Sequence, residues 1–354
     1  FDSLNILLFF LDHQKWNTRT IPSTNNGNGN NKNQPQQRKS IKSLFGVLFR
    51  VIIELVPMTV KTMGFIRRLH IDIIHTNTRI GSNQHGILAG WLTGIPGISH
   101  ERWWTPDTWL NRRLIEVPKV IICVSDAIKS NILEIGSVES KCRVIFNGRK
   151  LPALSGTGNK YSKVDVNKFA VGFMSNISEY KGHTVFVKGA IELLKKYPEM
   201  EFHIYGSTET AESQYLEFLK DLIDRAGFTD KIQFMGYVRE VNTVIQGFHL
   251  NCCLTIGDEP LSGTIIEGFL NRTVVMATKT GGSPELITHG ENGWLIEPNS
   301  VEAFMNAVEN LYQSPTLMKK LANNGFEFAL QNLTDESYVN NVQQVYEDVL
   351  SAQG

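Results

Sequence analysis

The chain has 354 residues, of which 42% are hydrophobic and 20% charged, so its composition is that of an ordinary globular protein of about two domains. This balance excludes collagen-like, wholly disordered and disulfide-rich proteins. The net charge is zero but uneven, because residues 1–155 carry 20 Lys and Arg against 10 Asp and Glu, and the remainder carries 15 against 25. The basic first half indicates an anionic partner, although no basic segment with interleaved aromatic residues favours nucleic acid.

The cysteine pattern indicates whether the protein works in a reducing or an oxidising compartment. The four cysteines are Cys123, Cys142, Cys252 and Cys253, and no two of them form a Cys-x-x-Cys pair or join histidines at zinc-site spacing. They are therefore expected to be reduced thiols, and no metal is expected. No signal peptide is recognisable in the sequence. We expect a cytoplasmic protein.

The first sixty residues contain three kinds of sequence. Residues 4–11 are continuously apolar and predict a short buried strand. Between Ser23 and Gln37, nine of fifteen residues are Asn or Gln, which predicts a disordered insertion over about 23–40. Residues 44–60 are again apolar, but two charged residues and a proline interrupt them, so they are too short and too charged to span a bilayer.

Two interpretations of residues 44–60 remain open. One is a core helix of an α/β domain. The other is a helix that lies on the inner face of a membrane, because Arg38, Lys39 and Lys42 precede the apolar residues and would contact anionic lipid headgroups.

Farther along the chain, strand-like apolar runs alternate with segments of helical periodicity. Strands are expected at 71–75, 94–99, 119–124 and 143–146, and in a second series at 169–174, 201–205, 231–235, 249–255 and 273–277. This alternation predicts an α/β fold class, with two Rossmann-like domains of parallel strands facing a cleft. The expected boundaries are 1–155, 156–335, and 336–354 for a terminal helix.

Doubly wound sheets bind ligands at the carboxyl ends of their strands. No G-x-G-x-x-G follows any expected strand, and the chain contains no Walker A sequence. A dinucleotide-dependent dehydrogenase and a P-loop enzyme are therefore disfavoured.

Two glutamates eight residues apart follow the strand expected at 249–255. Glu259 is predicted to lie in the loop, and Glu267 in the second turn of a helix that begins near Ser262. The first amides of that helix, including those of Gly263 and Thr264, would bind an anion, and the carboxylates would accept hydrogen bonds from sugar hydroxyl groups. The alternative is that these acidic residues only complement the helix dipole.

Residues after the neighbouring strands add to this candidate site. Lys181 precedes a helix, a position that is unfavourable for a cation unless an anion binds there too, although a solvated lysine is the alternative. Gly281 and Gly282 would allow a ligand close to the backbone, or form a plain tight turn. The segment Gly236, Tyr237 and Val238 offers backbone groups and an apolar wall to a nucleobase.

The first half contributes polar residues at expected strand ends. His75 with Asn77, and His100 with Arg102, lie at or just beyond these expected strand ends. His100 would hydrogen-bond a sugar or move a proton, and a structural histidine is the alternative.

Taken in order, these elements resemble the retaining glycosyltransferases of family 4, which have the GT-B fold. The resemblance covers roughly residues 71–350. It is carried by Asp72-Ile73-Ile74-His75, Gly94-Ile95-Pro96, Val124-Ser125, Asn147-Gly148, Lys181-Gly182, Gly236-Tyr237-Val238, the Glu259–Glu267 pair and Gly281-Gly282-Ser283-Pro284-Glu285.

The resemblance implies roles for individual residues. Glu259 would bind the donor sugar, Glu267 the ribose of the nucleotide and Lys181 the departing diphosphate. His100 would lie near the donor sugar across the cleft and, with Glu259 and Lys181, would be catalytic, and amides near Gly281 and Gly282 would approach that sugar. His75, Asn77 and Arg102 would lie on the acceptor side. The terminal helix would cross back to the first domain.

Two departures from the family pattern accompany the resemblance. Ser175 and Asn176 stand where family members often have a Gly-Arg pair that also binds phosphate, so Asn176 is a donor-site candidate without a charge. The first strand and Gly-rich loop typical of the family are not recognisable before the Asn/Gln-rich tract, and we expect them to be absent.

The resemblance predicts a retaining glycosyltransferase that moves a sugar from a nucleotide-diphosphate sugar to a hydroxyl of a glycan or lipid-linked acceptor in polysaccharide biosynthesis. It implies no cofactor and no metal. Partners would be the nucleotide sugar, the acceptor and a peripheral membrane surface, and not nucleic acid. Two alternatives stay open: a non-catalytic or truncated nucleotide-sugar-binding protein, and a sugar-nucleotide epimerase of the same fold.

Overall fold

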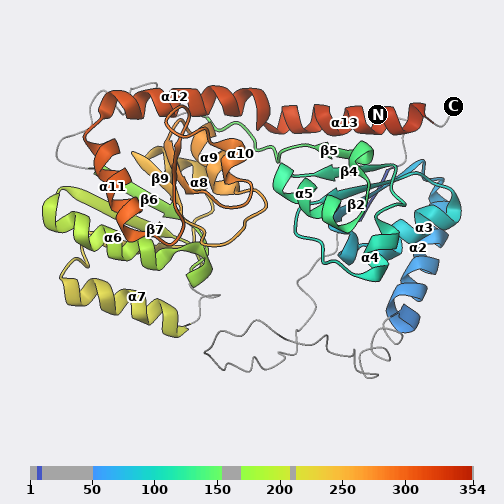
Figure 1. Cartoon of the computed structure of the whole chain (residues 1–354), viewed down its shortest axis with the longest axis horizontal. Helices are drawn as coiled ribbons and strands as arrows, with labels where there is room; N and C mark the ends of the chain where they lie inside the picture. Colours follow the sequence, from blue (N-terminus) through green and yellow to red (C-terminus); the bar gives the residue numbers. More distant parts are fainter. Residues whose placement is uncertain (1–5, 10–50, 154–168, 208–212, 353–354) are drawn as a thin grey trace.

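A computed structural model describes residues 6–9, 51–153, 169–207 and 213–352, which form two α/β lobes side by side (Figure 1). The first lobe contains a five-stranded sheet of order β1-β2-β3-β4-β5, and the second a six-stranded sheet of order β11-β10-β9-β6-β7-β8. All neighbouring strands run parallel. The predicted fold class is confirmed. The disordered insertion predicted at 23–40 lies outside the described residues.

The strands follow the two predicted series. In the first lobe they are β1 Ile6–Phe9, β2 Ile73–Thr78, β3 Gly97–Glu101, β4 Val120–Cys123 and β5 Cys142–Val144. In the second they are β6 Phe169–Met174, β7 Met200–Tyr205, β8 Ile232–Gly236, β9 Leu250–Cys253, β10 Val274–Thr278 and β11 Trp294–Ile296. The predicted segments overlap all of these strands except β11, which is an addition at the sheet edge.

Helices connect the strands and cover the sheets (Figure 1). In the first lobe they are a π-helical turn Val51–Leu55, α2 Val56–Leu69, α3 Gln84–Thr93, α4 Trp109–Leu114 and α5 Asp126–Ile135, with 3-10 turns at Ile80–Ser82 and Glu139–Lys141. In the second they are a 3-10 turn Glu179–Lys181, α6 His183–Lys196, α7 Ser213–Ala226, α8 Val241–Gln246, α9 Gly263–Leu270, α10 Ser283–Leu286, α11 Val301–Tyr312 and α12 Pro315–Asn332, followed by α13 Asp335–Ser351.

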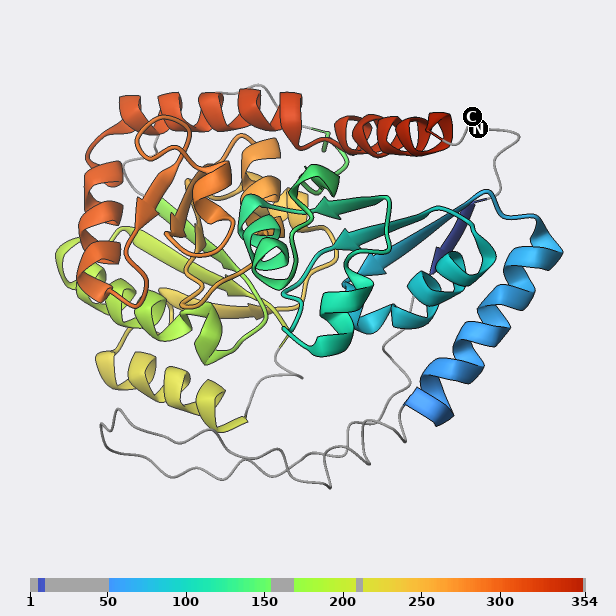
Figure 2. The same ribbon diagram turned by 45° about the vertical axis from the view of Figure 1, so that its right-hand side comes forward.

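The α2 helix corrects the helix expected within 44–60. The helical backbone runs from the π-helical turn Val51–Leu55 directly into α2, with Leu55 in the right-handed helical conformation, and Pro57 stands in the first turn of α2 without ending the helix. Val56, Met58 and Val60 are 51%, 41% and 62% exposed. The helix lies at the outer edge of the first lobe (Figure 2), where it packs one face on the lobe through the buried Ile66 and exposes the other face. Residues 44–50 of the expected helix lie outside the described residues. Among the described residues, no helix combines the length and apolarity needed to cross a bilayer.

The terminal helix α13 crosses back to the first lobe, as predicted. The Thr334 hydroxyl caps its start by accepting a hydrogen bond from the Ser337 N–H at 3.1 Å. While α12 lies over the second lobe, α13 lies over the first (Figure 1). Its apolar residues pack on one face of the first sheet in a cluster of Ile73, Ile98, Ile122, Ile145, Val342, Val345, Tyr346 and Val349.

One apolar cluster continues from the first lobe into the second, and we call it the bridging cluster. It joins Val124 and Ile128 at the β4–α5 junction to Leu261 and Leu286, which flank α9 and α10. Burial of this shared surface holds the carboxyl ends of the two sheets against each other, because separating the lobes would expose apolar side chains to water.

Two histidines are buried where α13 covers the first sheet. The His75 ring lies 5.4 Å from the His100 ring, and its Nδ1 is 2.6 Å from the Tyr346 hydroxyl. Burial, reinforced by the charge of Arg102, lowers the pKa of His75 from 6.5 to about 4. The same causes, together with His75, hold the pKa of His100 well below its usual value. Both rings are therefore neutral in the folded protein at pH 7.

This burial predicts that the free energy of unfolding decreases as the pH falls. The pKa of His75 is lower in the folded state, so its stabilising contribution is present above pH 6.5 and is lost as the pH falls towards 4. Its share of the loss between pH 7 and pH 5 should be about 2 kcal/mol of unfolding free energy. Chemical denaturation of His75→Gln at both pH values should show a smaller difference than the unsubstituted protein. The exposed control His70→Asn should keep the pH 7 to pH 5 difference of the unsubstituted protein. A His75→Gln difference equal to that of this control would contradict the assignment.

Candidate active site at the carboxyl edge of the second sheet

The centre of the site is an ion pair between two strand-end loops. Lys181 Nζ donates to Glu259 Oε1 at 2.8 Å, and the Thr255 hydroxyl donates to Glu259 Oε2 at 2.8 Å. Gly182 has φ +86°, and a Cβ atom there would lie 2.1 Å from the Leu254 carbonyl oxygen. Only glycine therefore allows the Lys181 turn to pack so closely on the end of β9. The pair is partly buried, with the Glu259 side chain 17% exposed.

The Gly281–Gly282 turn packs on the same loop. Gly281 has φ +50°, and a Cβ atom there would lie 2.0 Å from the Glu259 carbonyl oxygen. The Gly282 N–H donates to this oxygen at 3.0 Å, and the Gly281 N–H donates to Asp258 Oδ1 at 3.3 Å. The turn after β10 thus fixes the backbone that carries Glu259.

The α9 helix presents the second glutamate. Glu267 lies in its second turn, as predicted, and its Oε1 is 3.4 Å from Nε of Arg149. Burial raises the pKa of the Glu267 carboxyl, and the Arg149 charge opposes this shift. Gly263 begins the helix, and the Thr264 hydroxyl donates to the Met174 carbonyl at the end of β6, 3.1 Å away.

The remaining donor-side candidates lie at neighbouring strand ends. Asn176 follows β6 and is exposed. Gly236 ends β8 with φ +75°, Tyr237 after it is 73% exposed, and Val238 packs on a small apolar cluster with Phe248. All donor-side candidates therefore lie at the carboxyl edge of one parallel sheet.

The first-lobe candidates occupy a different place from the one expected. His100 has no exposed surface and lies between the rings of His75 and Tyr338, at centroid distances of 5.4 and 6.2 Å. Side chains alternate between the two faces of a strand, and this alternation puts His100 on the face that α13 covers. The expectation that His100 faces a donor sugar across the cleft is therefore corrected: here it is a packing residue.

The acceptor-side candidates are also engaged in this packing. Arg102 Nε donates to Asn77 Oδ1 at 2.6 Å, and its Nη2 donates to the Tyr338 hydroxyl at 2.7 Å. Arg102 Nη1 also donates to Asn147 Oδ1. The first sheet is therefore joined to α13, and to Asn147 after β5, by His75, Asn77 and Arg102. The structure does not bring these three residues to Lys181.

Two residues of the site region escaped the sequence analysis. Arg149 pairs with Glu267 across 118 positions. Glu285, named in the sequence only as part of the Gly281–Glu285 motif, crosses to the first lobe and accepts hydrogen bonds from the N–H groups of Asp126 at 2.6 Å and Ala127 at 2.8 Å, a contact the sequence did not indicate. This carboxylate caps the start of α5, a favourable position for a negative charge. Both contacts depend on tertiary structure, so no local pattern indicates them.

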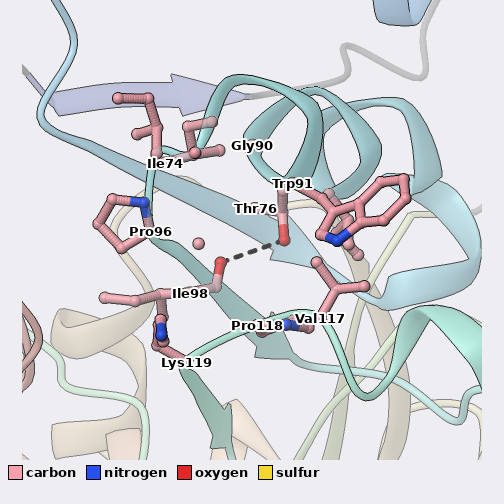
Figure 3. A pocket seen from close by; sticks show the side chains of 13 residues that line it. Ile74, Thr76, Gly90, Trp91, Pro96, Ile98, Val117, Pro118 and Lys119 are labelled. Carbon is pink, nitrogen blue, oxygen red and sulfur yellow. Dashed lines mark hydrogen bonds between the residues drawn. The ribbon is translucent and has the colours of Figure 1, made fainter.

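An apolar cavity of the first lobe lies apart from this site. Its volume is about 260 Å³, and it lies at the amino-terminal ends of the first-lobe strands, where Ile74, Pro96, Ile98 and Pro118 line it beside the exposed Trp91 (Figure 3). Ligand sites of parallel sheets lie at the opposite ends of the strands. In the part of the chain that the structure describes, no cluster of three or more His, Cys, Asp or Glu side chains could hold a metal ion.

Comparisons with known proteins agree with this architecture. The family model for glycosyltransferase family 4 matches residues 22–151, and that for glycosyl transferases group 1 matches residues 159–328. Two solved structures share the fold: Anabaena Alr3699/HepE in complex with UDP (TM-score 0.71, 23% identity, 83% of this chain and 82% of that chain) and a Rickettsia africae glycosyltransferase (TM-score 0.74, 20% identity, 90% and 84%).

Curated relatives match over shorter lengths. The lipopolysaccharide core biosynthesis mannosyltransferase LpcC of Rhizobium leguminosarum is 26% identical over 180 residues, 51% of each chain. The matches to the first three relatives span 51%, 41% and 63% of their lengths. The two family models together cover most of both lobes, and the structural neighbours are GT-B proteins. The chain belongs to the glycosyl transferases of group 1, family 4.

Proposed function

We propose that the protein transfers a sugar from a nucleotide-diphosphate sugar to a hydroxyl group of a glycan or lipid-linked acceptor, with retention at the anomeric carbon. The observation that carries the proposal is the Lys181–Glu259 pair, 2.8 Å apart at the carboxyl edge of a parallel sheet and beside the start of α9. The similar HepE protein binds UDP and UDP-glucose, which supports a nucleotide-sugar donor.

Each group at this edge suits one part of such a donor. The Glu259 carboxylate would accept hydrogen bonds from sugar hydroxyl groups, and Glu267 from the ribose. Amides at Gly263 and Thr264 would bind phosphate oxygens, because the first N–H groups of a helix have no partner within the helix. Lys181 would bind the phosphate attached to the sugar, whose oxygen departs with the nucleoside diphosphate.

Lys181 is the residue on which the mechanism depends. The bond between the anomeric carbon and the diphosphate breaks with its electron pair on the phosphate oxygen, where a fixed cation stabilises the charge that develops. The acceptor oxygen then bonds to the anomeric carbon on the same face, and its proton passes to the departing phosphate oxygen. Thr255 already donates to Glu259 Oε2, and sugar hydroxyl groups of the bound donor would engage the same carboxylate. Glu259 is therefore a poor nucleophile, which favours transfer without a glycosyl-enzyme intermediate.

The acceptor side is proposed to lie against a membrane surface. Val56 and Val60 are exposed on α2, and Lys61, Arg67 and Arg68 on the same helix are cations that would approach anionic headgroups. The name of the Rhizobium relative, a lipopolysaccharide core mannosyltransferase, supports a lipid-linked glycan as acceptor.

Two other functions are compatible with the same cleft. A sugar-nucleotide epimerase would convert the donor without any acceptor, and a binding protein would hold the nucleotide without turnover. Product sugars from a reaction with donor alone would identify an epimerase. Product that forms only when an acceptor is added would identify a transferase, and a binding protein would give no product in either reaction.

Replacement of Lys181 tests the proposed mechanism. Lys181→Ala should lower turnover about 100-fold or more, as loss of one preorganised donor to a developing anion does, while donor affinity falls less. Steady-state kinetics with a nucleotide-sugar donor gives both values. The control is Lys279→Ala, because Lys279 also forms an ion pair, with Glu297 at 2.7 Å, after β10. Unchanged turnover in Lys181→Ala would contradict the role.

Charge reversal on α2 tests the membrane contact. Each cation near an anionic surface contributes about 1 kcal/mol, so the combined change Lys61→Glu, Arg67→Glu and Arg68→Glu should weaken binding to anionic vesicles by about 100-fold or more. Vesicle sedimentation measures this. The control reverses Lys220 and Arg225 on α7, in the other lobe. Equal binding by the α2 variant and the control would argue against this surface.

A further inference from the structure

The candidate site contains two ion pairs, and within each pair the cation and the carboxylate neutralise each other. Lys181 Nζ and Glu259 Oε1 are 2.8 Å apart, and Arg149 Nε and Glu267 Oε1 are 3.4 Å apart. The second distance is near the limit for a hydrogen bond, so that pair is the weaker of the two. A ligand with both hydroxyl groups and phosphates could satisfy the carboxylates and the cations separately.

Arg149 has a backbone that is fixed in place. It lies on the segment that leaves the first lobe, beside the segment that returns to it. Its N–H donates to the Leu333 carbonyl at 2.9 Å, and its carbonyl accepts from the Asp335 N–H at 3.0 Å. A Cβ atom at Gly148 would lie 2.4 Å from the Thr334 carbonyl oxygen, so the two segments touch. The Arg149 side chain is 44% exposed, and apart from Glu267 its guanidinium donates to the Gly148 carbonyl, through Nη1 at 3.2 Å.

That side chain lies over the first turn of α9. A Cβ atom at Gly263 would lie 2.8 Å from Arg149 Nη2, so a side chain at this position would collide with the guanidinium. Glu267 lies one turn further along the same helix. The guanidinium therefore lies between the start of the helix and the Glu267 carboxylate. Burial raises the pKa of this carboxylate, which makes its ionised form costly.

The charge balance of the site indicates why an arginine is needed there. A nucleoside diphosphate carries at least two negative charges at neutral pH. Lys181 supplies one cation, and Ser175 and Asn176 after β6 supply none. Arginine binds phosphate through two parallel N–H bonds, which a lysine cannot do.

Resting on the proposed function, we propose that Arg149 is a donor-binding residue. Its guanidinium leaves Glu267 and binds a phosphate of the nucleoside diphosphate at the first turn of α9. The Glu267 carboxylate, released from Arg149, accepts hydrogen bonds from hydroxyl groups of the ligand. Every buried charge keeps a partner throughout this exchange, so neither group is left uncompensated.

Calorimetric titration of Arg149→Gln with UDP and with uridine tests the proposal. Loss of a charge-assisted bond should weaken UDP binding by about 10- to 100-fold, while uridine binding, which involves no phosphate, changes less than about twofold. Arg149→Lys keeps the charge without the two parallel bonds and should bind UDP with an intermediate affinity. Arg225→Gln, on the distant α7, is the matched control and should bind as the unsubstituted protein does. GDP with guanosine, and ADP with adenosine, replace the uridine compounds if another base is preferred.

Three results would overturn the proposal. UDP affinity that is unchanged or increased in Arg149→Gln would mean that Arg149 only shields Glu267. Equal losses for UDP and uridine would mean that Arg149 supports the fold of the site without touching phosphate. An unsubstituted, folded protein that binds no nucleoside diphosphate would overturn the proposed function as well, whereas the first two results leave it standing.

Discussion

The arrangement of this molecule depends on the apolar surface shared by its two lobes. The bridging cluster runs from Val124 and Ile128 to Leu261 and Leu286, so the carboxyl ends of β4 and β9 face each other. Its polar counterpart is Glu285, which joins the turn after β10 to the first N–H groups of α5. Non-directional apolar burial brings the lobes together, and the two directional hydrogen bonds fix how they are aligned.

The same constraint explains why the site contains paired charges. Loops that meet at the sheet edge partly bury Glu259 and Glu267, and a buried carboxylate is costly unless a cation or a hydrogen-bond donor faces it. Lys181 and Arg149 supply the cations, and glycines at 182, 263 and 281 allow the close approach. A donor that offers hydroxyl groups to the carboxylates and phosphates to the cations would replace both internal pairs.

The second lobe could be predicted closely because its signals are local. The strand expected at 169–174 is β6 residue for residue, and the positions of Glu259 in the loop and Glu267 in the second helical turn follow from a strand, a loop and a helix that are adjacent in the sequence. The short edge strand β11 was missed because its three residues give too little periodicity.

The first lobe was harder to predict because its polar residues depend on distant chain segments. His100 lies at a position whose face is set by strand alternation, and α13, more than 200 residues further along, decides that this face is covered. Pro57 stands within a continuous run of helical backbone from Val51 into α2, where the sequence alone indicated an interruption. Arg149 meets Glu267 only after the chain has crossed between the lobes, so no spacing in the sequence reveals that pair.

We propose that the carboxyl edge of the second sheet binds a nucleoside diphosphate. The most direct measurement is calorimetric titration of the protein with UDP, GDP and ADP in parallel, repeated with Glu267→Ala. We expect one of the three nucleotides to bind, and we expect the substitution to weaken that binding because Glu267 is proposed to accept hydrogen bonds from the ribose. A folded protein that binds none of the three, or that binds one with the same affinity after the substitution, would contradict the assignment of the nucleotide site to this sheet edge.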